Sequence, residues 1–455
     1  MLRFWIALWA SKLCLFIFKL TGHERDDRPG MLALRMCPNF FKYVKTPKLT
    51  IAVTGTNGKS TVSSIINNVL VREGMTTSYN DWGANHRPGQ ARCLLNAVNI
   101  FNRPNKDAAI LETDEMTSPM NVPYIKPDYM IVTNLERDSI RRNAHPEYIF
   151  SCIDKALKNS PDTVVILNAN DPVSCFLGEN NKRAYFGVAD TDSKSFESGI
   201  NDFSVCPKCY SIPKYNFKHY GHFGDFYCPE CGLKTPDCDY FATSIDYENR
   251  EMTVREGDKE YKYPIVSDTI FNAFNVLSII ALFRQMGISQ EKLSEHLSNS
   301  IIPVSRESCV EVNGIKLYTF VAKGQNVSAA SAVFEYMAKE PSKKELVLLL
   351  DEVYSNNIAT ETVTWIYESD FEFLKSDNIT KIVIAGSRIL DYKLRLMLAG
   401  IEEEKVVCVN DKFETPDCLD FTDVERIYVL HDVDSITTGR KVRDAIAEKI
   451  KGECE

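Results

Sequence analysis

The chain has 455 residues, of which 44% are hydrophobic and 25% charged, a composition typical of a globular protein with two or three domains. Its formal net charge of -9 argues against a general nucleic-acid binder. The 14 cysteines include two close pairs and are otherwise scattered, which predicts a cytoplasmic protein rather than a disulfide framework.

An apolar run near the N-terminus predicts a helix over Phe4–Leu20, within an N-terminal segment of residues 1–45. Ser11 and Lys12 interrupt the run, which is near the short limit for a membrane span, and no small-residue cleavage site follows it. Large apolar side chains recur at the spacing of an amphipathic helix: Trp5, Leu8, Trp9, Leu13 and Ile17. Two roles stay open, namely packing on the following domain and peripheral contact with the inner face of a membrane or with a lipid-linked substrate.

From Lys48 onward the chain alternates short apolar runs with helical patterns, which predicts parallel sheets covered by helices on both faces. The first block is expected to contain the strands Leu49–Val53, Ala108–Leu111, Tyr129–Thr133, Thr163–Leu167 and Arg183–Phe186. A long helix is expected over Ser267–Gly287, and a second block begins near Pro303. Its expected strands are Lys316–Val321, Glu345–Leu350, Lys381–Ala385, Lys405–Val409 and Arg426–Leu430. We therefore expect an α/β protein with one domain over residues 46–300 and a Rossmann-like domain over residues 301–455.

The first of these strands runs into a glycine-rich loop and then into a helix, the arrangement that binds a nucleoside triphosphate. Glycines let backbone N–H groups turn toward phosphate oxygens, Lys59 supplies a charge for the β- and γ-phosphates, and Ser60 or Thr61 supplies a hydroxyl for Mg²⁺. The general phosphate-loop pattern has a glycine where this chain has Val53, and an ordinary capped turn is the alternative. The residues expected to bind ATP here are Gly55, Thr56, Asn57, Gly58, Lys59, Ser60 and Thr61.

Carboxylates follow the strand that ends at Leu111. Ligands bind at the carboxyl edge of an open α/β sheet, so Glu112 is expected to hold Mg²⁺ together with Ser60, directly or through water. Asp114 and Glu115 could do the same, or could only cap the next helix.

Further polar residues are expected at the same edge. Asp138 follows the next strand and could orient substrate or metal, while Arg142 could bind a phosphate or carboxylate. A charged helix N-terminus is the competing interpretation of this segment. Asn272 and Asn275 begin the long helix, from which either could reach the nucleotide.

Two Cys-x-x-Cys pairs interrupt the alternating pattern between Asp192 and Asp239. Two such knuckles supply four thiolates, which suits a tetrahedral zinc site in a small insertion that lacks an apolar core of its own. Four protein ligands leave no open position, so the zinc would be structural. The ligands expected in this zinc ribbon, at about residues 200–238, are Cys206, Cys209, Cys228 and Cys231, with Cys238 left out. A redox dithiol is the alternative.

The compact Gly-Thr-Asn-Gly-Lys-Ser loop resembles the Mur ligases, a family of ATP-dependent amide-bond-forming enzymes. The order of the motifs resembles the MurT group of that family, the ligase subunits of lipid II isoglutaminyl synthase. These motifs are Gly55–Thr61, Asn80–Asn85, Glu112–Glu115, Asn134–Asp138, Asn168–Pro172, the four-cysteine insertion and Asn272–Asn275. Trp365–Glu368 and Gly386–Arg388 are similar to the MurT-type C-terminal domain.

The resemblance implies a Mur ligase-type ATPase domain and a reaction in peptidoglycan biosynthesis. ATP would phosphorylate the α-carboxylate of D-glutamate in the lipid II stem peptide, and ammonia would displace the phosphate to leave D-isoglutamine. The ammonia would come from a GatD-type class I glutamine amidotransferase subunit in a heterodimer. Lys59 and a Mg²⁺ ion on Ser60 and Glu112 would neutralise the γ-phosphate. Asp138, Arg142 and Asn85 would align the carboxylate.

The chain departs from the MurT pattern where it would meet the glutaminase. The group has an Asp-x-Ser-Trp segment whose Asp is thought to complete the partner's catalytic triad. Alignment on Trp365 puts Thr362 at that Asp, and Glu361 is the neighbouring carboxylate and the candidate to replace it. We therefore expect a divergent MurT with ATP, Mg²⁺ and a structural Zn²⁺ as its cofactors.

Three other functions stay open. Another Mur-type amide ligase would join an amino acid, but its carbamylated lysine has no clear match in Lys155 or Lys158. A catalytically lapsed MurT paralogue would have a regulatory role. A zinc-ribbon NTPase acting on nucleic acid is disfavoured by the net charge.

Overall fold

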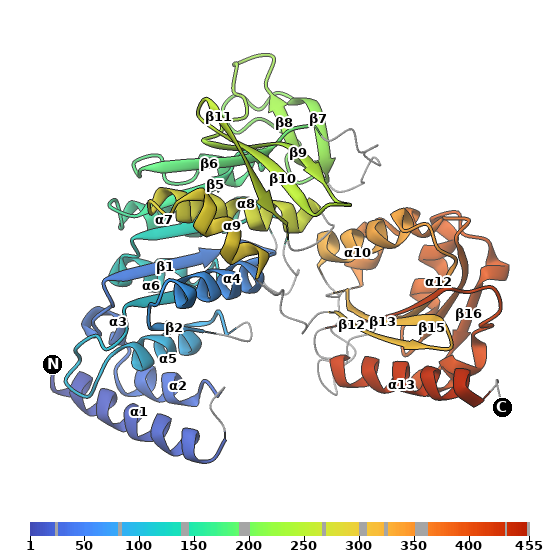
Figure 1. The fold of residues 1–455 in the computed structure, drawn as a ribbon, viewed down its shortest axis with the longest axis horizontal. Helices are drawn as coiled ribbons and strands as arrows, with labels where there is room; N and C mark the ends of the chain where they lie inside the picture. Colours follow the sequence, from blue (N-terminus) through green and yellow to red (C-terminus); the bar gives the residue numbers. More distant parts are fainter. Residues whose placement is uncertain are drawn as a thin grey trace. The chain divides into compact units, whose positions relative to one another are not determined.

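The computed structural model describes residues 1–22, 26–80, 84–137, 145–190, 201–265, 270–299, 307–322, 326–350, 363–432 and 435–452. The chain divides into two compact units, one built mainly from the residues before 303 and the other mainly from those that follow (Figure 1).

A nine-stranded sheet forms the centre of the first unit, in the order β11-β10-β9-β6-β5-β4-β1-β3-β2. In this order, all the strands from β9 to β2 pair in parallel with their neighbours. Strands β10 and β11 extend the sheet beyond β9 as antiparallel strands. All five strands expected here are confirmed, and so is the α/β class. The strand bounds are β1 Leu49–Thr54, β2 Thr77–Tyr79, β3 Ala108–Glu112, β4 Tyr129–Val132, β5 Val164–Asn168, β6 Arg183–Val188, β9 Tyr240–Asp246, β10 Glu251–Glu256 and β11 Lys259–Pro264.

Strands β9 to β11 were not expected from the sequence. Their inward side chains, such as Met252 and Val254, alternate with polar ones, so the segment contains no continuous apolar run. The alternation typical of an antiparallel strand with one solvated face was the signal that could have identified them.

Helices cover both faces of the first sheet. Ile51 and Val53 point into the core under α4 and α8, whereas Ala52 between them points to the opposite face, under α7. The long helix expected near residue 267 is confirmed as α8. The helix bounds are α1 Leu2–Leu20, α2 Arg28–Met36, α3 Phe40–Tyr43, α4 Lys59–Arg72, α5 Arg87–Ala97, α6 Ser118–Ile125, α7 Pro146–Lys158, η2 Ser174–Phe176, α8 Ile270–Gln285 and α9 Gln290–Ser298.

The expected N-terminal helix is α1, but its buried face differs from the expected stripe. Phe4, Ala7, Leu8 and Ser11 are buried, so packing on the first unit is real. Of the apolar stripe, Leu8 alone is fully buried, while the side chains at Trp9, Leu13 and Ile17 are exposed. The spacing correctly predicted a helix, but both of its faces are apolar, so periodicity could not tell which one packs. None of the described helices has both the length and the hydropathy to cross a bilayer.

The second unit contains a six-stranded sheet in the order β12-β13-β17-β14-β15-β16, parallel except for β12. All five strands expected here are confirmed. The strand bounds are β12 Glu307–Val312, β13 Ile315–Val321, β14 Lys344–Leu349, β15 Ile379–Ala385, β16 Val406–Val409 and β17 Arg426–His431. Helices α10, α11 and α12 pack on one face and α13 on the other. The remaining elements are α10 Val327–Lys339, α11 Thr364–Glu368, η4 Phe371–Leu374, α12 Ile389–Leu398, η5 Glu403–Lys405, η6 Lys412–Cys418 and α13 Ile436–Gly452.

Gly30 fixes the close approach of α2 to α5. A Cβ atom there would lie 1.9 Å from the Pro88 carbonyl oxygen, so no larger residue fits without moving a helix. We predict that Gly30→Ala lowers the free energy of unfolding by about 1–3 kcal/mol, as overpacking does. Thermal denaturation would measure the effect. Gly452→Ala is the matched control, because a Cβ at Gly452 meets nothing within 4 Å, and an equal loss in both variants would contradict the explanation.

Candidate active site

The glycine-rich loop has the backbone shape that its sequence predicts. Gly55 and Gly58 have φ values of 124° and 87°, in the left-handed region, and α4 starts at Lys59 directly after them. A Cβ at Gly58 would lie 2.3 Å from Asn275 Oδ1, so the N-terminal part of α8 touches the loop. Asn272 accepts a hydrogen bond from Asn275 at 3.3 Å. Both predicted asparagines therefore lie at this end of α8, with Asn275 in contact with the loop.

Carboxylates at the end of β3 reach the loop. The Lys59 ammonium lies 2.7 Å from Glu115 Oε1 and also donates to the Gly55 carbonyl oxygen. The same Glu115 oxygen accepts from the Gly55 N–H, whereas Ser60 Oγ donates to Glu112 Oε1 at 3.1 Å. A hydroxyl and a carboxylate that converge in this way are the oxygen ligands that Mg²⁺ takes beside a nucleotide, so these two residues fit the ion.

Asp114 and Glu115, for which two roles were left open, make different contacts. Asp114 accepts a hydrogen bond from the N–H of Thr117, the residue before α6. Glu115 instead balances the charge of Lys59 at the loop. No local pattern separates the two carboxylates, because only the folded turn decides which of them faces the loop.

Asn80 holds Glu112 in place, a role not identified from the sequence. Its side chain accepts from the Glu112 N–H at 2.7 Å and donates to the Glu112 carbonyl oxygen at 2.8 Å. Asn80 follows β2 at the same edge of the sheet, and that position was the available signal. Asn85 lies nearby, where its carbonyl oxygen accepts from Asp114 N and Gln90 Nε2.

The residues after β4 support the loop from the other side. Asn134 accepts from the Thr56 and Asn57 N–H groups, through its carbonyl oxygen and Oδ1 respectively. Thr133 Oγ1 donates to the Asn57 carbonyl oxygen at 2.6 Å, and Asn57 Nδ2 donates to Glu136 Oε2 at 2.5 Å. Burial raises the pKa of the Glu136 carboxyl to about 7, against the lowering effects of His222 and Asn57. Asp138 and Arg142, predicted farther along this segment, lie outside the described residues, as does Glu361.

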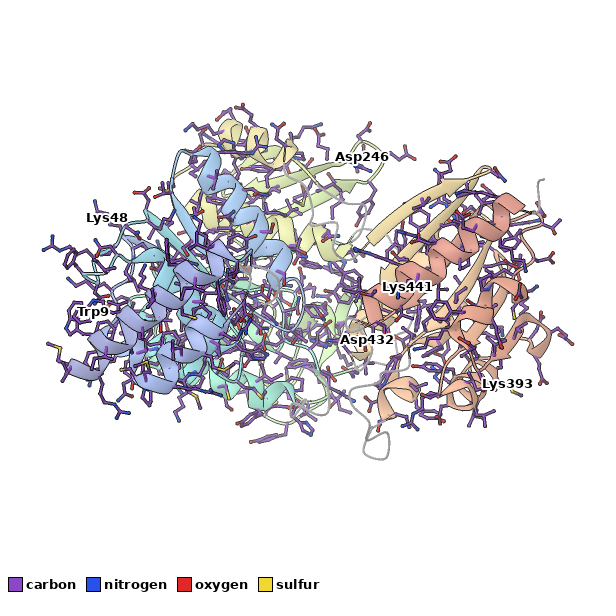
Figure 2. All side chains as sticks on the ribbon, turned by 90° about the horizontal axis from the view of Figure 1, so that it is seen from below. Trp9, Lys48, Asp246, Lys393, Asp432 and Lys441 are labelled. Carbon is purple, nitrogen blue, oxygen red and sulfur yellow. The ribbon has the colours of Figure 1, made fainter. Side chains whose placement is uncertain are left out.

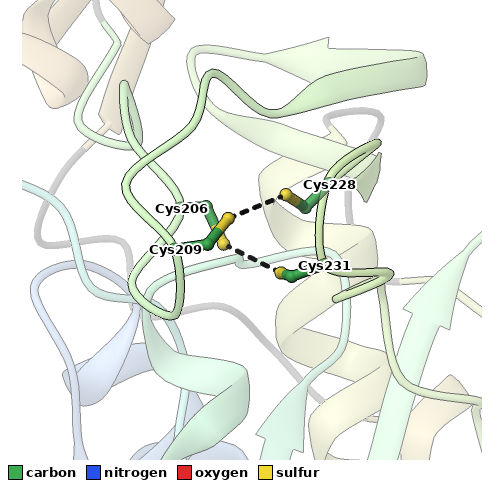
Figure 3. A group of neighbouring side chains, drawn as sticks. All are labelled: Cys206, Cys209, Cys228 and Cys231. Atoms are coloured by element: carbon green, nitrogen blue, oxygen red, sulfur yellow. Dashed lines mark hydrogen bonds between the residues drawn. The ribbon is translucent and has the colours of Figure 1, made fainter.

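The expected zinc ligands converge at one point (Figure 3). The four thiol sulfurs of Cys206, Cys209, Cys228 and Cys231 lie within 4.8 Å of one another, and the two cross-knuckle contacts measure 3.6 and 3.4 Å. Tetrahedral Zn–S bonds of about 2.3 Å require sulfurs about 3.8 Å apart, so this donor set fits zinc.

Both knuckles use the same backbone turn. The residue after each second cysteine has a positive φ, 62° at Tyr210 and 71° at Gly232, and donates its N–H to the first cysteine's carbonyl oxygen. Between the knuckles runs a two-stranded hairpin, β7 Lys214–Tyr220 and β8 Phe223–Tyr227.

The hairpin turn brings His222 against Asp171 in the core. His222 Nε2 lies 3.4 Å from Asp171 Oδ1, and the two side chains are 1% and 0% exposed. Neither residue was singled out from the sequence as part of the site. Asp171 belongs to a motif after β5, but nothing in the local pattern near His222 indicates where the hairpin points.

Both halves of the chain match known protein families. Residues 53–218 match the family model of the Mur ligase middle domain, and residues 324–433 match that of the MurT ligase C-terminal region. The subunit MurT of lipid II isoglutaminyl synthase (glutamine-hydrolyzing) from Staphylococcus aureus (strain COL) is 26% identical over 409 residues, which is 89% of this chain and 90% of that protein. The protein of the same name from Streptococcus pneumoniae (strain ATCC BAA-255 / R6) is 26% identical over 428 residues, 93% of each chain.

Among solved structures, a pseudomurein peptide ligase type C from Methanothermus fervidus superposes with a TM-score of 0.67 at 19% identity, over 89% of this chain and 80% of that one. At this identity the likeness shows the fold, which is that of the Mur ligases. The fold, the four-cysteine insertion and matches to both halves of a MurT subunit lead to one assignment: the chain belongs to the Mur ligase family, as a divergent member of its MurT group.

Proposed function

We propose that this chain is the ligase subunit that amidates the α-carboxylate of D-glutamate in lipid II, with ATP as the activating substrate and ammonia from a GatD-type glutaminase subunit. The observation that carries the proposal is the combination of a loop built for ATP with a MurT-type C-terminal region on the same chain. A Mur ligase that joins amino acids would not account for that C-terminal match.

In this reaction the chain's first task is to hold the triphosphate. The N–H groups of the loop and the Lys59 ammonium bind phosphate oxygens, and Glu115 holds that ammonium at the loop through an ion pair of 2.7 Å. Ser60 and Glu112 would hold Mg²⁺, which supplies positive charge at the phosphates. Asn80 fixes the backbone of Glu112, so the carboxylate is positioned before the nucleotide arrives.

The second task is to bring the carboxylate into line. One carboxylate oxygen attacks the γ-phosphorus, the bond to ADP breaks, and an acyl phosphate forms. Ammonia then attacks the acyl carbon, phosphate leaves, and a proton is lost to give the carboxamide. Asp138, Arg142 and Asn85 are the proposed aligning residues, and Glu361 is the proposed contact to the glutaminase.

We also propose that α1 docks on the inner face of the membrane that carries the lipid-linked substrate. Its outward face exposes Leu13 and Phe16 to 61% and 59%, and Trp9 also lies at the surface (Figure 2). Residues 1–49 contain nine Lys or Arg against three Asp or Glu, whereas the whole chain carries a charge of -9. An apolar helix face in a basic segment is complementary to an anionic bilayer surface.

For the nucleotide loop, we predict that Lys59→Met lowers the affinity for ATP·Mg²⁺ by about 100-fold or more, because the cation at the phosphates is lost. The rate of ADP release in the presence of ammonium and lipid II should fall by a similar factor. Calorimetry and mass analysis of the amidated product are the measurements. Lys48→Met, at an exposed position before β1, is the matched control. Unchanged affinity in the Lys59 variant would overturn the proposed function. Product formation that required an amino acid instead of ammonium would favour the other type of Mur ligase.

For the metal site, we predict one zinc ion per chain, lost in Cys209→Ser and in Cys228→Ser. Because binding of structural zinc supplies folding free energy, both variants should also melt at a lower temperature. Elemental analysis and thermal denaturation would check this. Cys238→Ser should keep its zinc, since Cys238 is not one of the four clustered sulfurs; a chain that loses zinc in this variant would disprove the ligand assignment.

For the membrane surface, we predict that the chain floats with vesicles containing anionic lipid and that Leu13→Ser with Phe16→Ser weakens this partition about tenfold or more. The control is Leu390→Ser with Leu394→Ser, which removes two exposed leucines from α12 instead. Equal flotation of both double variants would refute docking through α1. A change in oligomeric mass without a change in flotation would mean that the face binds a second copy of the chain.

A further inference from the structure

The zinc ribbon brings a histidine to the turn after β5, next to the segment that supports the nucleotide loop. The hairpin rests on the turn after β5, where Gly224 N donates to the Asn170 carbonyl oxygen at 2.8 Å. His222, in the turn of that hairpin, stacks on Phe223 with ring centroids 4.5 Å apart and faces the buried carboxylate of Asp171. A histidine and an aspartate that are both fully buried form a strongly coupled pair, because removing either leaves the other without its partner away from water.

Hydrogen bonds on both sides of a short backbone segment connect Asp171 to the loop. Asp171 Oδ2 accepts from the Leu135 N–H at 2.7 Å, which fixes the segment on either side of Leu135. That segment holds the loop through Asn134, which accepts from Asn57 N at 2.9 Å, and through Glu136, which accepts from Asn57 Nδ2. The imidazole of the ribbon therefore connects to the phosphate cradle through its 3.4 Å contact with Asp171, the backbone of residues 134–136 and these hydrogen bonds.

The charges along this path are coupled. The carboxylates that face His222 are Asp171, Asp202 and Glu136; burial lowers the pKa of the imidazole, but these three groups raise it overall. The pKa of Glu136 is raised to about 7, chiefly by burial and in smaller part by Asp171 and Asp202, while the charge of His222 and the hydrogen bond from Asn57 lower it. An ionised Glu136 accepts a stronger hydrogen bond from Asn57 than a protonated one does.

We propose that His222, carried by the zinc ribbon, is a positioning residue for the nucleotide loop and acts on it through Asp171 and Glu136. The zinc site then supports nucleotide binding from a distance, because the metal holds the hairpin that presents the imidazole. The inference rests on the proposed function only in taking residues 55–61 as the nucleotide site.

The sign of the pH dependence follows from Glu136. Its pKa is raised by folding to about 7, so its carboxylate is largely ionised above that pH and becomes protonated below it. Nucleotide affinity should therefore fall as the pH drops through about 7. Without the positive charge of His222 the pKa of Glu136 rises, and the fall should begin at a higher pH.

The test is the affinity of the full chain for ADP·Mg²⁺ between about pH 5.5 and 8.5, where the imidazole and the carboxyl both titrate. His222→Gln should shift the midpoint of the profile upward by about one pH unit and weaken binding several-fold at neutral pH. His219→Gln is the matched control: His219 lies buried in the same hairpin, but its Nε2 contacts the Val188 carbonyl oxygen and its pKa is lowered, chiefly by burial. It should keep the wild-type profile.

Glu136→Gln provides a second readout if the His222 variant folds poorly. Its amide oxygen can still accept from Asn57 but cannot titrate, so the profile should become flat over this range. A wild-type profile in a folded, zinc-containing His222→Gln protein, or in Glu136→Gln, would overturn the inference while leaving the proposed function intact. A wild-type chain that binds no nucleotide would overturn both.

Discussion

The site depends on two glycines whose neighbours leave no room for a side chain. A Cβ at Gly55 would lie 2.3 Å from Thr133 Oγ1, and one at Gly58 would lie equally close to Asn275 Oδ1. The loop is therefore packed tightly against the residue after β4 on one side and against α8 on the other. A phosphate cradle is useful only if its N–H groups stay aimed at one place, and these two close contacts provide that rigidity.

The backbone position of each carboxylate near the loop determines which group it contacts. Glu112 is still part of β3 and is locked by Asn80, so its side chain reaches Ser60. Glu115 lies in the following turn and pairs with Lys59. These two acids, three positions apart, thus have different cationic partners. Glu115 pairs with the Lys59 ammonium of the protein, and Glu112 is the expected ligand of the metal ion. Exchanging either for a shorter acid would change the distance rather than the charge, which makes this part of the site sensitive to geometry.

Local patterns in the sequence predicted the parts of the molecule that local chemistry determines. Glycines before Lys59, apolar runs such as Ile51–Val53 and the four-cysteine spacing each require a particular backbone, and the structure has it. Contacts between distant segments were not predictable in this way. The pairing of Glu115 with Lys59 and the position of His222 depend on how separate turns meet at the edge of the sheet, and no periodicity encodes that. The exposed face of α1 was missed because both of its faces are apolar.

The topology of the sheet explains why a zinc ribbon lies next to a nucleotide loop. Strand β6 pairs in parallel with β5, which pairs in parallel with β4, so all of them end at the edge where the loop follows β1. A segment inserted after Val188 must leave the sheet at that same edge. Because β9 then pairs in parallel with β6, the chain has to return to the opposite edge before the sheet continues, and the ribbon lies within this long connection. A module inserted at this point can therefore bring a side chain to the turn after β5 without interrupting a strand, which is how His222 reaches Asp171.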